Sequence, residues 1–281
     1  MTSRGEGTRV SAHEGGHNLD LHHCSSRDFG AEALGASGVQ GSLSEYGDLY
    51  CNMGSSSGHY TASQKVDLGW ASMDSGTHQV QTVQSSGAFT IVPAESATPG
   101  VMALKVKRGT DNTNSNWLYV EFRQNGGDYD TTTTSAGDNN GALIHYEDSI
   151  TRSLGGRTHL LDFVPADGWT NVALASGQSW SDTDSLGNPY SNLSISVGNA
   201  TSASLDVTVS YGSIPCVEID PTVSIAPSNQ SAFAGGSASF TVTVTNNDNS
   251  GCSPGTFALS STIPDGWLET FLPASLALSN G

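Results

Sequence analysis

Residues 13–23 read HEGGHNLDLHH, and the rest of the chain can be interpreted outward from this stretch. We predict a helix over residues 8–21, because apolar positions recur there at helical spacing and Thr8 can cap the start. Gly15 and Gly16 each weaken a helix by about 1 kcal/mol relative to Ala. Their presence predicts that another part of the chain approaches this helix closely.

Two histidines of the predicted helix are suited to binding one metal ion. His13 and His17 are four residues apart, so they share a face and can direct imidazole nitrogens at one Zn²⁺. His23 lies beyond the helix and can return to supply a third nitrogen. Three protein ligands and one open position are the arrangement of a catalytic zinc. Glu14 can then serve as the general base that takes a proton from the attacking water.

The pattern His-Glu-x-x-His occurs by chance in many chains, and its alternative reading is a surface helix with solvated histidines. A third histidine at a suitable distance favours the zinc site. His22 competes with His23 for the role of third ligand. The spacing favours His23, and we expect His22 to be exposed.

The stretch resembles the metzincin signature of zinc metallopeptidases, His-Glu-x-x-His-x-x-Gly-x-x-His. It departs at Asp20, where the family has a Gly that allows a sharp turn at positive φ. Asp is among the few other residues that tolerate this left-handed conformation, so we expect the turn to survive. Further on, Met53 in the run CNMG is similar to the metzincin Met-turn, which places a Met side chain beneath the metal.

Additional motifs resemble the gametolysin-like branch of this family and its secreted bacterial relatives. They are EYGD at 45–48 and YTASQKVDLGW at 60–70, and the whole likeness covers residues 8–70. The resemblance implies a secreted zinc endopeptidase that acts on protein or peptide substrates. We predict a second helix over residues 61–70. Tyr60 can be read as a hydrogen-bond donor to the oxyanion, although a packed aromatic at a helix start is the better explanation.

Metzincins place a sheet before the active-site helix, and its edge strand binds the substrate. Only twelve residues precede His13, and the start MTSRGEG has no apolar signal-peptide core. The resemblance therefore predicts an N-terminally truncated fragment that has lost its signal peptide. Two alternatives stay open: a catalytically inactive extracellular adhesion or carbohydrate-binding module with a vestigial zinc site, and a metal-binding structural protein. The intact Glu14 favours hydrolysis, since structural zinc has no use for a base.

The composition is acidic and polar. The formal net charge is −17, with 27 Asp and Glu against 10 Lys and Arg, so we expect no nucleic-acid partner. No apolar run reaches the roughly 18 residues of a spanning helix, so we expect no membrane span. A surface rich in Ser, Thr and Asn is typical of secreted bacterial proteins. Ca²⁺ is a second candidate cofactor because Asp side chains offer oxygen ligands, but solubility through net charge explains them more simply.

The four cysteines fall into two separated pairs, Cys24 with Cys51 and Cys216 with Cys252. Four cysteines allow three connectivities. Pairing within each local pair is the simplest, because each disulfide then stays inside one expected domain. Disulfides imply an oxidising, extracellular compartment. A Cys24–Cys51 bond would also tie the segment after His23 to the Met-turn.

The chain as a whole is predicted to be mainly β, with three domains. Residues 1–76 form the C-terminal part of a metzincin catalytic domain, with the active-site helix, the Met-turn and a C-terminal helix, and residues 24–48 are expected to be a loop. Residues 77–212 form an antiparallel β-sandwich, and residues 213–281 an incomplete immunoglobulin-like domain. Candidate strands of the sandwich are residues 78–83, 88–92, 101–106, 117–124, 142–146, 172–175, 193–197 and 204–211, with polar loops at 109–116 and 129–140.

The last domain should contain strands at residues 221–227, 238–245, 257–263 and 276–278. The β domains could also contact a cell surface or an extracellular matrix. Trp117, Trp169 and Trp180 are candidates for a carbohydrate platform. Packed core and turn aromatics are the better explanation, because no two of them are spaced as an exposed stripe.

Overall fold

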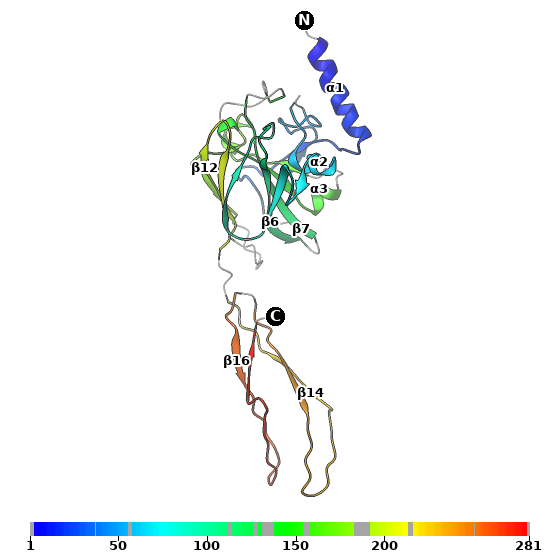
Figure 1. The fold of residues 1–281 in the computed structure, drawn as a ribbon, viewed down its shortest axis with the longest axis vertical. Helices are drawn as coiled ribbons and strands as arrows, with labels where there is room; N and C mark the ends of the chain where they lie inside the picture. The colour runs from blue at the N-terminus through cyan, green and yellow to red at the C-terminus, as the bar shows by residue number, and fades with distance from the viewer. Residues whose placement is uncertain are drawn as a thin grey trace. The chain divides into compact units, whose positions relative to one another are not determined.

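The computed structural model of the chain shows a mainly β protein (Figure 1). It describes residues 3–36, 38–55, 58–111, 114–125, 129–130, 138–153, 158–182, 192–212, 216–249 and 251–279. The chain divides into two compact units, Met1–Gly212 and Ser213–Gly281. No helix in the described part of the chain is long and apolar enough to cross a membrane.

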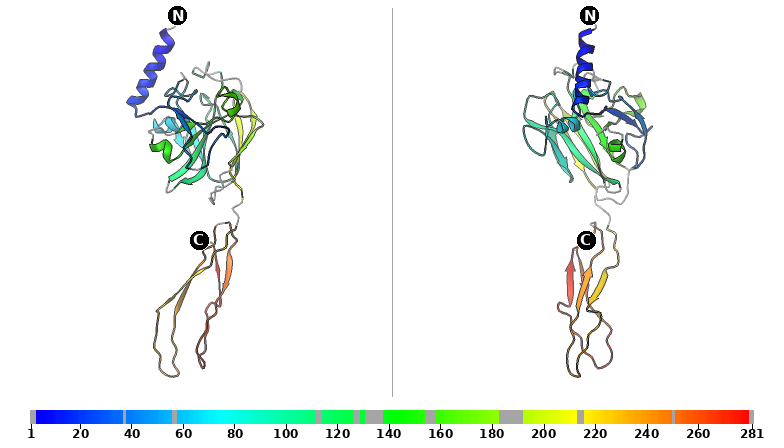
Figure 2. Two further views of the ribbon diagram at one scale, coloured as in Figure 1. Left: turned by 180° about the vertical axis from the view of Figure 1, so that it is seen from behind. Right: turned by 90° about the vertical axis from the view of Figure 1, so that its right-hand side faces the viewer.

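Helix α1, Ser3–Asn18, carries the first two histidines of the opening stretch. It begins before Thr8, so the prediction that Thr8 caps it is wrong: the helix continues through Gly5 and Gly7, which lower its propensity without breaking it. The helix meets the rest of its unit at its C-terminal end (Figure 2). Its last turn closes as a Schellman motif, with Asp20 N–H donating to the His17 carbonyl at 3.1 Å and Leu21 N–H to the Gly16 carbonyl at 3.0 Å.

The residue that makes this turn possible is Asp20, whose φ is +64°. The prediction that Asp20 tolerates a left-handed turn is therefore confirmed. The turn reverses the chain directly after α1, so that the following residues run back along the helix. This reversal is what brings His23 toward the face that carries His13 and His17.

Helix α2, Ala62–Asp67, is shorter than predicted and begins with a capping box. The Thr61 side chain accepts from the backbone N–H of Gln64, and the Gln64 side chain accepts from the backbone N–H of Thr61. Gly69, at φ +70°, follows the helix and ends it. A third helix, α3 at Ser149–Ser153, was not predicted.

Two sheets form the body of the first unit. The larger has the strand order β2-β1-β9-β8-β7-β6-β4-β3, with β10 paired to β8. Its strands are β1 Ser25–Asp28, β2 Ser42–Ser44, β3 Ser72–Met73, β4 His78–Val83, β6 Gly100–Asp111, β7 Asn114–Phe122, β8 Gly141–Glu147, β9 His159–Leu160 and β10 Leu174–Ala175. The smaller has the order β11-β12-β13-β5. Its strands are β5 Gly87–Ile91, β11 Ser179–Ser181, β12 Ser194–Ala200 and β13 Leu205–Ser210.

One buried apolar cluster takes side chains from both sheets, such as Leu104 and Val120 from the larger and Ile195 and Val207 from the smaller. The two sheets therefore pack face to face as a sandwich. The larger sheet is mixed rather than antiparallel as predicted, because β4 pairs in parallel with β6, and β1 with β9. The chain between β4 and β6 passes through β5 in the other sheet, so both strands enter from the same end.

Two predicted loops are wrong. Residues 24–48 contain β1 and β2, which pair with each other, and residues 109–116 contain the ends of β6 and β7. Ser and Gly are frequent in residues 24–48 and Asn in residues 109–116, but strand pairing satisfies their backbone groups all the same. Most of the predicted loop at 129–140 lies outside the described residues. Because β1, β2 and β3 belong to the larger sheet, segments 1–76 and 77–212 lie in one compact unit.

The described residues of the second unit form two antiparallel hairpins; the sequence pattern predicts strands in these regions but not how they pair. Strand β14, Thr222–Ala226, pairs with β15, Thr241–Thr245; strand β16, Gly255–Ala258, pairs with β17, Ser275–Leu278. A Cys216–Cys252 disulfide closes the start of the unit. Among its described residues, only Asn246 and Cys252 are buried, so this unit contributes little apolar core.

Candidate metal centre

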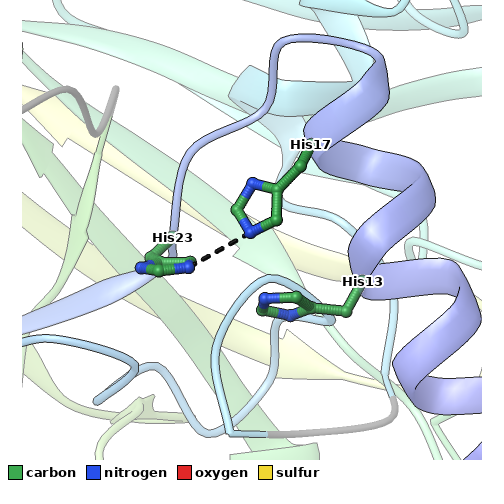
Figure 3. A group of neighbouring side chains, drawn as sticks. All are labelled: His13, His17 and His23. Atoms are coloured by element: carbon green, nitrogen blue, oxygen red, sulfur yellow. Dashed lines mark hydrogen bonds between the residues drawn. The ribbon is translucent and has the colours of Figure 1, made fainter.

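Three histidine side chains converge where α1 ends (Figure 3). His13 and His17 project from one face of α1, and His23 approaches from the segment that follows the Asp20 turn. One nitrogen from each ring lies within 4.8 Å of the others. The closest pair is His17 Nε2 and His23 Nε2, at 3.2 Å.

The hydrogen bonds of the three rings fix which nitrogen of each carries a proton. Each ring uses Nδ1 to bond an oxygen: His13 the Asn52 carbonyl at 2.9 Å, His17 the Leu21 carbonyl at 2.8 Å, and His23 the Glu45 carboxylate at 2.7 Å. A carbonyl or carboxylate oxygen only accepts, so Nδ1 must donate. The Nε2 lone pair of each ring is then free to bind a metal.

This arrangement fits zinc. Tetrahedral zinc with Zn–N bonds of about 2.0–2.1 Å holds its ligand nitrogens about 3.3 Å apart. The His17–His23 separation of 3.2 Å matches this value. At that distance the two Nε2 atoms share a cation, either a proton in a hydrogen bond or a metal ion, and a metal ion can also engage His13.

The structure also shows where the other predicted site residues lie. His22 is exposed and takes no part in the histidine cluster, and its carbonyl accepts from the Gln64 side chain at 3.2 Å. Glu14 is exposed on α1 beside His13, so its carboxylate is accessible to water. The structure thus brings His13, His17 and His23 together and leaves His22 outside.

Met53 is fully buried in a small cluster beneath the end of α1, with Leu21 and the two cysteines Cys24 and Cys51. A Cβ atom on Gly16 would collide with the Met53 sulfur, so this glycine lets Met53 pack directly under the helix. The expected close approach is therefore found at Gly16. Nothing lies within 4 Å of the corresponding position at Gly15.

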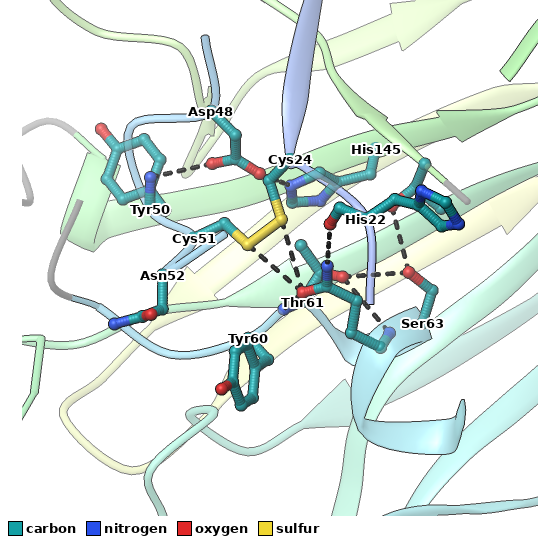
Figure 4. The surroundings of a disulfide bond; sticks show 12 residues. His22, Cys24, Asp48, Tyr50, Cys51, Asn52, Tyr60, Thr61, Ser63 and His145 are labelled. Carbon is teal, nitrogen blue, oxygen red and sulfur yellow. Dashed lines mark hydrogen bonds and ion pairs between the residues drawn. A yellow bond between two sulfur atoms is a disulfide. The ribbon is translucent and has the colours of Figure 1, made fainter. Parts of the chain in front are cut away.

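The predicted Cys24–Cys51 disulfide is formed and lies beside the Met53 turn (Figure 4). A hydrogen bond of 2.9 Å from Cys24 N–H to the Met53 carbonyl joins the same two segments. Cys24 is the residue after His23, so the disulfide and this bond hold the third histidine close to the turn. Asp48 lies near both sulfurs, but these are bonded to each other and are not available to a metal.

Tyr60 is used to anchor the helix. Its hydroxyl donates to the Ala12 carbonyl at 2.8 Å, and its ring lies 5.6 Å from that of Trp70. Burial raises the pKa of this hydroxyl, so it stays protonated and able to donate. The placement fits a packed aromatic, because the proton that an oxyanion would need already has an acceptor in α1.

A buried charged network joins the site to the larger sheet, and its link between Asp48 and His145 was not predicted. Asp48 pairs with His145 of β8 at 2.9 Å, and Arg123 pairs with Glu121 of β7 at 3.1 Å. Figure 4 shows Asp48 directed at His145 next to the disulfide. Burial lowers the pKa of His145, but the Asp48 carboxylate outweighs this, and the pKa lies above its usual value.

The same network holds the segment between the Met53 turn and α2. Arg123 donates to the Tyr60 carbonyl at 3.3 Å, and Glu121 accepts from the Ala62 N–H at 2.9 Å. The available sequence signal was charged residues inside otherwise apolar strands, LYVEFR at 118–123 and ALIHYE at 142–147. Such residues are rarely buried unless they are paired.

No protein-family model, curated protein or solved structure matches this chain. The chemical interpretation therefore rests on the residues themselves. Three tryptophans were considered for carbohydrate binding, and each packs against a different apolar cluster. They are Trp180, Trp117 and Trp169. They do not form one exposed platform.

Proposed function

We propose that this chain is a zinc-dependent endopeptidase of the metzincin type, related to the gametolysin-like branch. The observation that carries the proposal is the common orientation of three imidazoles, each tied through Nδ1 to an oxygen and each directing Nε2 toward the others. The Met53 side chain under α1 and the left-handed turn at Asp20 support the proposal, because the resemblance to the metzincin signature predicts both features.

His13, His17 and His23 hold the zinc ion in this proposal. Bound zinc supplies Lewis acidity, polarising a carbonyl and lowering the pKa of water toward neutrality. Glu14, exposed beside His13, takes up the proton of the water that attacks the peptide carbonyl and passes it to the leaving amine. Tyr60 keeps its donor bond to α1 and positions the helix that carries the two first ligands.

A hydrolytic role is favoured over a structural zinc site by the number of ligands. Among the described residues, the cluster contains three potential ligands, and no fourth His, Cys, Asp or Glu joins them. Structural zinc sites usually close with a fourth protein ligand. Three ligands and an accessible carboxylate are what a catalytic site requires.

A secreted location is part of the proposal. Both disulfides are compatible with an extracellular protein, and the acidic, polar composition suits it. Contacts of the β domains with a cell surface or matrix, and a Ca²⁺ requirement, remain predictions from composition. Protein or peptide substrates follow from the proposed chemistry.

The test is to produce the chain in an oxidising compartment and to measure its zinc content and its cleavage of casein, with and without a chelator. We expect one zinc per chain and chelator-sensitive cleavage. Glu14→Ala should keep the zinc and lose activity by at least about 100-fold. Glu32→Ala, at another exposed glutamate, is the control and should change neither quantity. Zinc bound without chelator-sensitive cleavage would contradict peptidase activity of this chain.

A further inference from the structure

The three histidines differ in what holds them. His13 and His17 are on α1 and donate to backbone carbonyls, whose positions are set by the fold. His23 is in an irregular segment, and its Nδ1 donates to a side chain, the carboxylate of Glu45, at 2.7 Å. The hydrogen bond that orients the third imidazole therefore depends on a side chain, which a substitution can remove.

The sheet explains why these two residues meet. Strand β1 begins just after His23, and β2 ends just before Glu45. The strands are antiparallel, with Ser26 opposite Ser44, so the residues that precede β1 lie beside those that follow β2. The juxtaposition of His23 and Glu45 is therefore built into the pairing of β1 with β2.

A tight turn then fixes the direction of Glu45. Gly47 N–H donates to the Ser44 carbonyl at 3.0 Å, and a Cβ on Gly47 would collide with the Ser26 hydroxyl and the Ser44 carbonyl. Tyr46, at φ +61° in the same turn, places its ring 3.9 Å from the His23 ring, centroid to centroid. The His23 imidazole is thus held at its Nδ1 by Glu45 and on its face by Tyr46.

We infer that Glu45 is a positioning residue for the metal centre, which orients His23 so that its Nε2 faces the other two rings. The inference rests on the proposed zinc site. A carboxylate that accepts from the far nitrogen of a ligating histidine fixes its tautomer and strengthens its bond to the metal. A charged acceptor forms a stronger hydrogen bond than the neutral carbonyls that hold the other two rings.

The other explanation is an ordinary surface ion pair. The Glu45 side chain is 64% exposed and that of His23 is 23% exposed. An exposed pair contributes little to folding stability. The two explanations therefore predict different results, because a positioning residue changes metal affinity while thermal stability stays nearly constant.

The experiment measures zinc affinity of the full chain by competition with a chromophoric chelator, together with the visible spectrum of the Co²⁺-loaded protein and the Tm of the metal-free protein. Glu45→Ala should weaken zinc binding by about 10–100-fold and alter the Co²⁺ spectrum. Glu45→Gln keeps an acceptor for Nδ1 and loses the charge, so its zinc affinity should fall by less than that of Glu45→Ala. Tm should change by less than about 2 °C in both variants.

Glu32→Gln is the matched control, since Glu32 is an exposed glutamate in the connection between β1 and β2. It should bind zinc as the unchanged chain does. Zinc binding in Glu45→Ala within about twofold of the unchanged chain would overturn the role of Glu45 and leave the zinc site intact. Failure of the unchanged chain to bind zinc would instead overturn the proposed function.

Discussion

Asp48 and His145 form a fully buried ion pair, 2.9 Å from carboxylate oxygen to Nε2, between the segment that carries the Met53 turn and a central strand of the sheet. They are 97 residues apart in the sequence. Asp48 also accepts from the Tyr50 N–H at 2.8 Å, and its N–H donates to the Cys24 carbonyl at 3.2 Å. This one carboxylate therefore connects the floor of the histidine cluster to β8.

Replacing His145 by Leu should destabilise the protein by about 3–5 kcal/mol, because it leaves the Asp48 carboxylate buried without its ion-pair partner. Denaturant unfolding at neutral pH would measure this. His78→Leu is the control, since His78 is only half-buried at the start of β4, and it should cost less than about 1 kcal/mol. Equal effects of the two substitutions would show that the Asp48–His145 pair is not important for stability.

Gly16 and Gly15 give a matched pair of substitutions on one helix. Gly16→Ala should destabilise by about 1–3 kcal/mol, because the new methyl collides with the Met53 sulfur. Gly15→Ala meets no neighbour and should stabilise by about 1 kcal/mol through helix propensity. Thermal unfolding would show whether Tm falls in Gly16→Ala and rises in Gly15→Ala. A stabilising Gly16→Ala would contradict the packing of Met53 under α1.

Asp20 should tolerate Gly and resist Ala. Its φ of +64° costs a residue with a Cβ about 1–2 kcal/mol, and Asp offsets part of this through local hydrogen bonding. Asp20→Gly should therefore keep stability within about 1 kcal/mol, whereas Asp20→Ala should lose about 1 kcal/mol. In the zinc proposal, Asp20→Ala also weakens zinc binding, since the turn delivers His23. Unchanged zinc affinity and stability in Asp20→Ala would argue against this role of the turn.

Stability should fall as pH falls below about 6.5, partly because of His159. Burial, and then the charge of Arg27, lower its pKa to about 4. The unfolded chain takes up a proton near pH 6.5 that the folded protein refuses, so this stability is present above pH 6.5 and is lost toward pH 4. The shift corresponds to on the order of 3 kcal/mol.

Denaturant titrations between pH 7 and pH 4.5 would measure that slope, and His159→Leu should flatten it. His145 acts in the opposite direction, because its raised pKa gives stability that is present below pH 6.5 and lost as pH rises through the folded value. Because this contribution is constant below about pH 6.5, His145→Leu should change the pH dependence of stability above that pH and leave the slope on the acid side as it is. An identical pH slope in the His159 variant and the unchanged chain would rule out this origin.

Much of the local structure could be predicted from short-range patterns. The helix that carries His13 and His17 on one face and the left-handed turn at Asp20 depend on residues a few positions apart. The spacing of apolar and turn residues also placed most strands of the sandwich and three of the four described strands of the second unit, whereas the predicted strand at 257–263 overlaps β16 only at its end. The predictions failed for β1 and β2, whose polar sequences form strands only because neighbouring strands satisfy their backbone groups.

The sequence by itself determined the helix that carries His13 and His17, the turn after it and the alternation of the strands, because these follow from neighbouring side chains and backbone sterics. Only the tertiary structure decided that His23 joins them with Glu45 behind it, that Met53 lies under Gly16, and that Asp48 meets His145. Those contacts depend on which strands pair and in what register. Pairing across tens of residues is decided by burial and buried charge, which no local pattern contains.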